Sequence, residues 1–89
     1  MNLDTLGFLA GTVSAIVFLP QVIKTYQTKS VKDISFLMFS LATLSVILWL
    51  AYGIILENKP IIFTNGCVLI LSLIMLYFKI SYGKHEKNK

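Results

Sequence analysis

Charged residues are scarce in this sequence, and their scarcity limits the class of protein. Of 89 residues, only 13% are charged and 56% are hydrophobic, whereas a soluble domain carries about 25% charged residues. The few charges are clustered, which leaves three uncharged runs at Thr5–Ile23, Ile34–Leu56 and Pro60–Phe78. Each run, as a helix, spans roughly the 30 Å of a bilayer's hydrocarbon core. We therefore predict an all-α integral membrane protein, a bundle of three transmembrane helices.

Cysteine and histidine occur once each, so the chain offers little for disulfide, metal or redox chemistry. Cys67 lies inside the third apolar run without a second cysteine, and we interpret it as a packing residue. His85 has only Glu86 near it as a possible metal ligand, and the lysine-rich tail around it is typical of a solvated segment. There is also no nucleophile–base pair, carboxylate dyad or nucleotide-binding glycine loop. We predict that the chain is not an enzyme and binds no cofactor or metal.

The chain length allows a single domain, residues 1–89. We expect helices over about residues 4–26, 34–56 and 60–82, with a disordered tail at 83–89. The connections at 27–33 and 57–59 are short, which favours antiparallel packing of consecutive helices. A water-soluble bundle is disfavoured because helices apolar on nearly every face would leave much of that surface exposed. A cleaved signal peptide is disfavoured because residues 1–5 contain no Lys or Arg.

The lysines predict the orientation in the membrane. Three lie between the first two runs and four follow the third, whereas Lys59 alone lies on the other side. By the positive-inside tendency, the first loop and the C-terminus are cytoplasmic, and the N-terminus is outside. The lysines are distributed according to the side of the membrane and do not form one basic binding face, so we predict no nucleic-acid partner. We expect the lipid bilayer to surround the helices.

Local signals refine the helix ends. Asp4 or Thr5 is a candidate cap for the first helix, Asp33 or Ser35 for the second, and Pro60 suits the first turn of the third. Pro20 lies well inside the first helix, where it cannot donate to the carbonyl of residue 16, and it predicts a kink near the cytoplasmic end. The adjacent amide of Gln21 should face protein or water.

Two stripes of small, hydroxyl-bearing and aromatic residues recur at helical spacing. The first contains Gly7, Gly11, Ser14, Phe18, Gln21 and Thr25. Its glycines favour close helix packing over ligand binding. The second contains Met38, Ala42, Ser45, Trp49, Tyr52 and Leu56. Because Trp49 lies deeper than the interfacial belt where Trp is usually found, the second stripe is the better candidate for a binding surface.

Trp49 and Asn65 are predicted to lie at one depth, about 6 Å outward of the midplane by helix rise. An indole plane covers the C–H faces of a sugar, and an amide both donates to and accepts from hydroxyls. A purely structural interhelical hydrogen bond is the equally weighted alternative for Asn65. No charged side chain lies inside any run, which favours a neutral substrate and passive transport over ion coupling.

Four segments together resemble the SemiSWEETs, bacterial half-size relatives of SWEET sugar transporters within the Pro-Gln-loop group. They are Phe18-Leu19-Pro20-Gln21, Asp33-Ile34-Ser35, Trp49-Leu50-Ala51-Tyr52-Gly53 and Asn65. The resemblance implies a parallel homodimer in the bacterial inner membrane that holds a sugar between its two copies. Related proteins often close the outer side with an Arg–Asp bridge, but Leu56 and Asn58 stand at those positions here.

The resemblance also implies roles for individual residues. Trp49 and Asn65 of both copies would bind a mono- or disaccharide. Pro20 would be a hinge that Gln21 supports, and alternating access would follow from its bending. Phe18 and Met38 resemble an inner gate, and Tyr52 resembles part of an outer gate.

Two other classes of function stay open from the residues themselves. One is a non-transporting or holin-like pore-forming membrane protein, which needs neither Trp49 nor Asn65. The other is a Pro-Gln-loop carrier of a different neutral solute.

Overall fold

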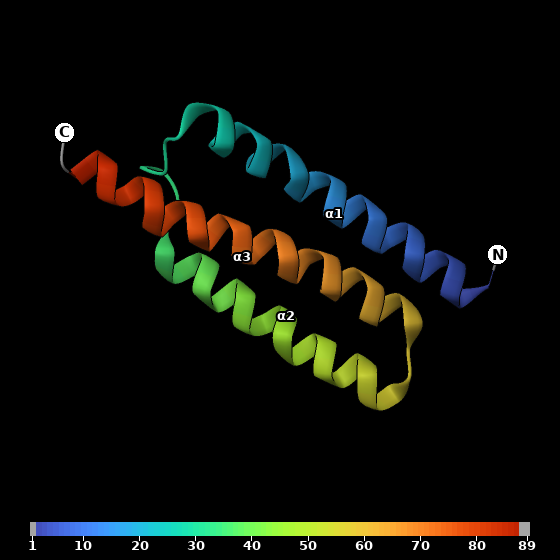
Figure 1. Ribbon diagram of the computed structural model, residues 1–89. Helices are drawn as coiled ribbons and strands as arrows, with labels where there is room; N and C mark the ends of the chain where they lie inside the picture. Colours follow the sequence, from blue (N-terminus) through green and yellow to red (C-terminus); the bar gives the residue numbers. More distant parts are fainter. Residues whose placement is uncertain (1, 88–89) are drawn as a thin grey trace.

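Three long helices make up the chain in the computed structural model, which describes residues 2–87 and side chains as far as Lys84 (Figure 1). Helix α1 covers Leu3–Thr28, α2 covers Phe36–Leu56 and α3 covers Lys59–Lys87. Each helix is long and apolar enough to cross a membrane. The predicted three-helix membrane fold is therefore confirmed.

The helix bounds lie within two residues of the predicted ones except at the end of α3, and the cap of α1 also differs. Asn2, rather than Asp4 or Thr5, caps α1, because its side-chain oxygen accepts from the Thr5 N–H at 2.7 Å. Ser35 caps α2, as predicted, by accepting from Met38 N at 3.1 Å. At the other end of the chain α3 extends to Lys87, so residues 83–87 of the expected tail are helical, and 88–89 lie outside the described residues. Val31 of the α1–α2 loop lies beside this part of α3, since a Cβ added at Gly83 would lie 3.8 Å from the Val31 Cγ2.

Helix α3 lies between α1 and α2 and packs against both (Figure 1). The expectation that consecutive helices pack together holds for α2 and α3, which are joined by a tight turn, but is wrong for α1 and α2. These two run antiparallel with α3 between them, because the loop at residues 29–35 passes across α3. The backbone forms a thin slab of 52 × 22 × 14 Å.

Small residues permit the close approach of α3 to both neighbours. A Cβ added at Gly7 would lie 2.8 Å from the Pro60 Cβ, and one at Gly11 would collide with Thr64. On the other side, a Cβ at Gly53 would lie 2.5 Å from the Ile61 Cγ2. Such small-residue contacts are the usual way in which helices pack where no hydrophobic effect drives them together.

A small core lies at the end of the molecule that carries the α1–α2 loop. Val31, Met75 and Phe78 are buried there, and Phe18 and Phe39 pack against them. The loop is fixed to α3 because the Lys79 Nζ donates to the Val31 carbonyl at 2.8 Å. These contacts explain why Val31, although it is a loop residue, is as deeply buried as the most buried residues of the helices.

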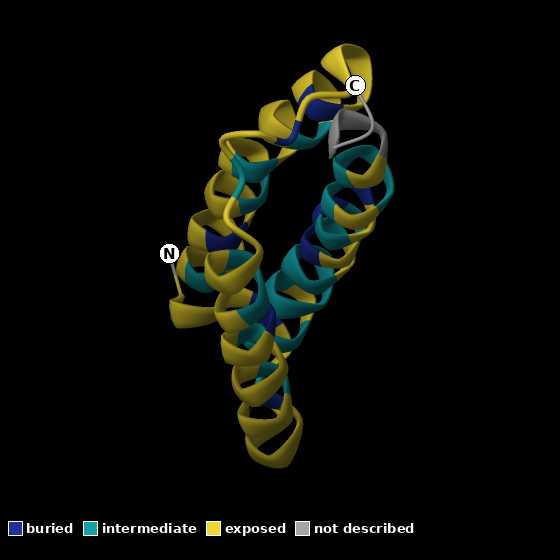
Figure 2. Ribbon diagram, turned by 90° about the vertical axis from the view of Figure 1, so that its left-hand side faces the viewer, coloured by how far each residue is buried: buried dark blue, intermediate teal, exposed yellow. Residues whose placement is uncertain are grey.

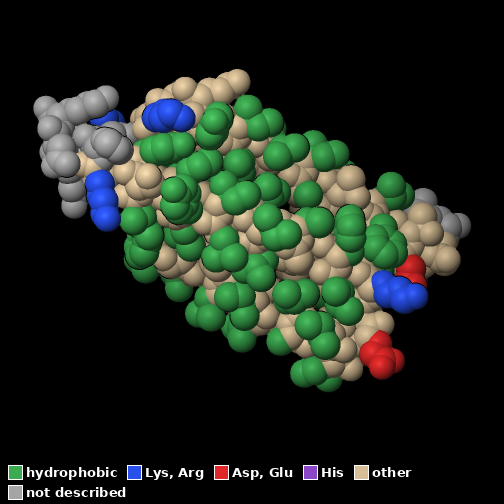
Figure 3. Space-filling model, in the orientation of Figure 1, with side chains coloured by type: hydrophobic (Ala, Val, Ile, Leu, Met, Phe, Trp, Pro, Cys, Tyr) green, Lys and Arg blue, Asp and Glu red, His purple; other side chains and the backbone are tan. Residues whose placement is uncertain are grey.

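Most residues of α1 and α2 are exposed in the single chain, including many large apolar side chains (Figure 2). The apolar residues form a belt around the middle of the face shown in Figure 3, and the charged residues lie at its two ends. An exposed apolar surface of this extent is stable in lipid and unstable in water.

Candidate functional site

Helix α2 has one face that packs on α3 and one that remains open. The packed face carries Phe39, Thr43 and Gly53, which are half-buried or buried. The open face carries the second polar and aromatic stripe, with Met38 exposed by 66%, Trp49 by 52% and Tyr52 by 51%. Packing within the chain therefore does not account for this stripe.

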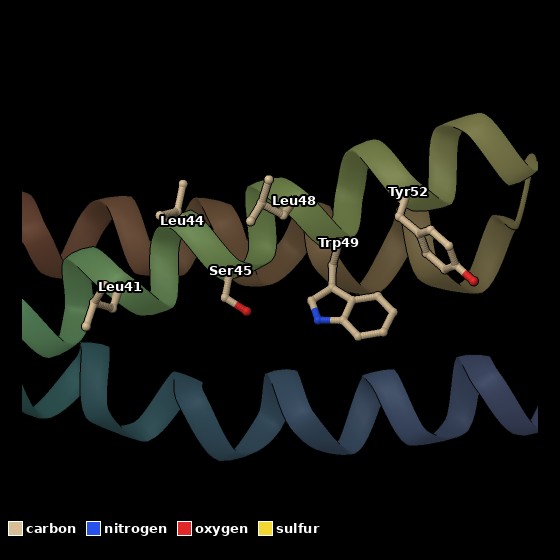
Figure 4. Close-up of a pocket in the computed structure, with 6 residues that line it drawn as sticks. All are labelled: Leu41, Leu44, Ser45, Leu48, Trp49 and Tyr52. Atoms are coloured by element: carbon tan, nitrogen blue, oxygen red, sulfur yellow. The ribbon is translucent and has the colours of Figure 1, made fainter.

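A groove of about 440 Å³ runs along the open side of α2 (Figure 4). It is lined by Leu41, Leu44, Ser45, Leu48, Trp49 and Tyr52. The Ser45 hydroxyl and the Trp49 indole point to the same side of α2, and Tyr52 lies one turn further along (Figure 4). The Trp49 and Tyr52 rings meet edge to face, with centroids 5.6 Å apart. The groove thus combines aromatic planes with two hydroxyls and an indole N–H.

Asn65 lies on α3 at the depth of Trp49 but does not line this groove. The contact between Gly53 and Ile61 sets the register of the α2–α3 hairpin. Trp49 and Asn65 are each about one helical turn deeper in the membrane than that contact. The two side chains therefore occupy one level on adjacent helices.

The Asn65 amide is hydrogen-bonded only to its own helix. Its Nδ2 donates to the Ile61 carbonyl at 2.9 Å, and its oxygen accepts no hydrogen bond from the described residues. The side chain is half-buried. Within the described part of a single chain, Asn65 therefore forms no hydrogen bond to another helix, which was the alternative to a binding role. Its amide oxygen is available to a ligand or to a second chain.

The first stripe is largely a packing surface. Gly7 and Gly11 face Pro60 and Thr64 of α3. Thr25 is buried, and its hydroxyl donates to the Gln21 carbonyl at 2.8 Å. The packing interpretation of this stripe fits these contacts.

The predicted hinge residues lie on the part of α1 nearest the loop. Helix α1 is continuous through Pro20, which is exposed. Gln21 is also exposed and lines a second, polar pocket of about 350 Å³ together with Lys24 and Asp33. Gln21 thus faces a polar space, as expected for an amide near the end of a span.

The two residues predicted to form an inner gate have different environments. The Phe18 ring meets Phe39 of α2 edge to face, with centroids 5.8 Å apart, so side chains of α1 and α2 touch at this level. Met38, by contrast, is mostly exposed. The aromatic contact joins α1 to α2 on the loop side of the groove.

Sequence patterns did not identify two polar contacts. The Thr43 and Ser72 hydroxyls are hydrogen-bonded to each other in the buried interface of α2 and α3. Asn58 caps α3, because its side-chain oxygen accepts from Ile61 N at 3.1 Å. Hydroxyl residues occur on several faces of these helices, so only the packing singles out Thr43 and Ser72.

No group of three or more His, Cys, Asp or Glu residues that could hold a metal ion occurs among the described residues. The uncharged runs identified in the sequence cover all of α2 and most of α1 and α3. The groove therefore presents neutral donors, neutral acceptors and apolar surface.

Comparison with known proteins gives consistent matches. A model of the PQ loop repeat matches residues 3–63. A sugar transporter SemiSWEET of Leptospira biflexa is 38% identical over 90% of this chain and 94% of its own length. A solved bacterial homologue of SWEET transporters is 34% identical, with a TM-score of 0.84, over 89% of this chain and 95% of that one. A SemiSWEET solved in the inward-open conformation has a TM-score of 0.85 at 27% identity, over 94% and 90% of the two chains.

Proposed function

Because this chain belongs to the PQ loop repeat family, we propose that it is a sugar transporter of the SemiSWEET kind, acting passively as a homodimer. The observation that carries the proposal is the open stripe on α2, which leaves Trp49, Ser45 and Tyr52 exposed along an apolar helix. The hydroxyls and the indole N–H of this stripe are costly to leave without hydrogen-bond partners in lipid. The exposure of the stripe is explained if the stripe faces a polar ligand and a second copy of the chain.

The substrate is a mono- or disaccharide bound near the level shared by Trp49 and Asn65. The Trp49 indole covers the apolar face of the ring, and the available Asn65 oxygen accepts from a hydroxyl. A groove of about 440 Å³ is within the range of small-molecule sites. It is open along its length, so a single chain does not enclose a ligand.

The second copy completes the site. In a parallel homodimer the two chains are related by an axis along the membrane normal, and their open faces lie opposite each other. The site then contains two copies of Trp49 and two copies of Asn65. The lysines at the loop end favour a cytoplasmic position for that end and an external N-terminus. This arrangement encloses the polar stripe and leaves the apolar belt facing lipid.

Transport proceeds by alternating access. Pro20 leaves the Ile16 carbonyl without its helical donor, which weakens α1 at this point and allows it to bend. Bending changes the contact of Phe18 with Phe39 on the cytoplasmic side, where Met38 also lies, while Tyr52 closes the outer side. The absence of charged residues from the runs favours movement down the sugar gradient without ion coupling.

Counterflow of labelled glucose and sucrose in proteoliposomes tests the proposal. Trp49→Ala and Asn65→Ala should each lower saturable exchange about tenfold or more, because each removes a contact worth roughly 1–3 kcal/mol. Thr12→Ala is the matched control, since the exposed Thr12 hydroxyl is bonded to the Phe8 carbonyl of its own helix. Unchanged exchange in both site variants would contradict the proposed pocket.

The same vesicles separate the alternative functions. A pore would leak unrelated solutes without saturation and would not depend on Asn65. A carrier of another neutral solute would show no exchange of either sugar but would retain the fold. Loss of exchange on adding a protonophore would contradict the uncoupled mechanism.

A further inference from the structure

Three lysines gather where the α1–α2 loop meets the last turns of α3. Lys32 of the loop and Lys79 and Lys84 of α3 line a pocket of about 530 Å³. No carboxylate lines it among the side chains that the structure describes, and the nearby Asp33 lines the separate pocket that contains Lys24. The described lining of the pocket therefore carries positive charge and no negative charge.

The N-terminus of α2 adds to this positive potential. Phe36, the first residue of α2, is also part of the lining. Ser35 caps the N–H of Met38, but the N–H groups of Phe36 and Leu37 have no acceptor among the described residues. The free N–H groups at a helix N-terminus favour a bound anion.

The remaining wall of the pocket is apolar. Phe36 and Ile80 are each 51% exposed and lie beside the lysines. A small soluble anion would contact only the cationic groups and leave these side chains uncovered. A ligand that joins an anionic head to a hydrocarbon chain would contact both.

The three lysines have different structural roles. Lys79 is half-buried and holds the loop by donating to the Val31 carbonyl at 2.8 Å. Lys32 and Lys84 are exposed, and no hydrogen bond or ion pair joins their ammonium groups to the described part of the chain. Lys79 thus fixes the pocket, and Lys32 and Lys84 are available to a ligand.

We propose that this pocket binds the phosphate headgroup of an anionic phospholipid, with Lys32 and Lys84 on the phosphate and an acyl chain along Phe36 and Ile80. Its position at the end of the apolar belt corresponds to headgroup depth. Basic pockets between helices at the cytoplasmic side are suited to such lipids. This site is separate from the groove on α2 and does not depend on what the groove transports.

Native mass spectrometry of the purified full chain in detergent, titrated with phosphatidylglycerol or phosphatidylcholine, tests the proposal. Phosphatidylglycerol should bind about tenfold more tightly than phosphatidylcholine, and the Lys32→Gln/Lys84→Gln double variant should lose that preference. The Lys24→Gln/Lys59→Gln double variant removes the same charge elsewhere and should retain it. Equal binding by both double variants would overturn the proposal.

Two further measurements identify the ligand and check the fold. If inorganic phosphate bound as tightly as phosphatidylglycerol, with the same lysine dependence, the pocket would be a soluble-anion site and the lipid assignment would be wrong. Circular dichroism checks the fold of each variant. Should the double variant fail to fold, the exposed single variant Lys84→Gln should still weaken phosphatidylglycerol binding about threefold, and unchanged binding in it would overturn the proposal.

Discussion

Polar side chains within the apolar spans differ in how their hydrogen bonds are satisfied. The hydroxyls of Thr12 and Ser14 donate to carbonyls one turn back in their own helix, which makes them tolerable in lipid. Thr43 and Ser72 satisfy each other across an interface. Asn65 differs because its amide oxygen has no donor among the described residues. At the scale of single residues, each of these four hydroxyl oxygens takes part in a hydrogen bond, whereas the Asn65 oxygen takes part in none with the described residues.

Gly11 and Gly66 provide a matched pair of glycines for testing the packing of α3. At Gly11 an added methyl group would collide with Thr64, whereas at Gly66 nothing lies within 4 Å. Gly11→Ala should lower the free energy of unfolding by about 1–3 kcal/mol through overpacking. Gly66→Ala should raise it by about 0.5–1 kcal/mol, because Ala is the better helix former.

Thermal unfolding of the two purified variants in detergent, followed by circular dichroism, measures both effects. If the two substitutions changed thermal stability equally, the result would contradict the close approach of α1 and α3.

Among the elements, α1 is the one whose interior contains a proline. Pro20 lies about two turns before the last residue of α1, Thr28, and the helix is followed by Lys29, whose φ is 55°. The Lys29 ammonium lies 4.2 Å from the Tyr26 ring centroid and donates to the Tyr26 carbonyl at 3.0 Å. These contacts stabilise the end of α1, so we predict that the helix bends at Pro20 in its interior and does not fray at its end.

Pro20→Ala should restore the missing hydrogen bond to the Ile16 carbonyl and stiffen α1. We expect sugar exchange to fall about tenfold or more while equilibrium sugar binding changes little, because the substitution affects movement and leaves the groove on α2 intact. Counterflow and equilibrium binding on the same preparation separate the two effects. Normal exchange in Pro20→Ala would show that transport does not require bending at this residue.

The whole molecule is a thin slab with one helix between two others, and such a slab cannot surround a ligand. Its extents are 52 × 22 × 14 Å, and its groove is open along one side of α2 (Figure 4). Closed symmetric pairing of two copies is the commonest way in which such a face is covered. The unit of transport is therefore expected to be larger than the single chain.

Mixing wild-type and Asn65→Ala chains tests this expectation. If both copies contribute to one site, an equal mixture should retain about a quarter of the wild-type exchange, because only dimers of two wild-type chains are active. Independent chains would retain about a half. Mixtures of wild type with Thr12→Ala provide the control and should keep full exchange.

The sequence by itself determined the number of helices, their approximate bounds and the end of the bundle at which most lysines gather, because apolar length and charge position are local properties. It also singled out the stripe that contains Trp49. Only the tertiary structure decided that α3 lies between α1 and α2, that Gly53 meets Ile61, and that Thr43 is bonded to Ser72. These features depend on which faces of three similarly apolar helices approach most closely, and that competition is settled by packing between residues distant in the sequence.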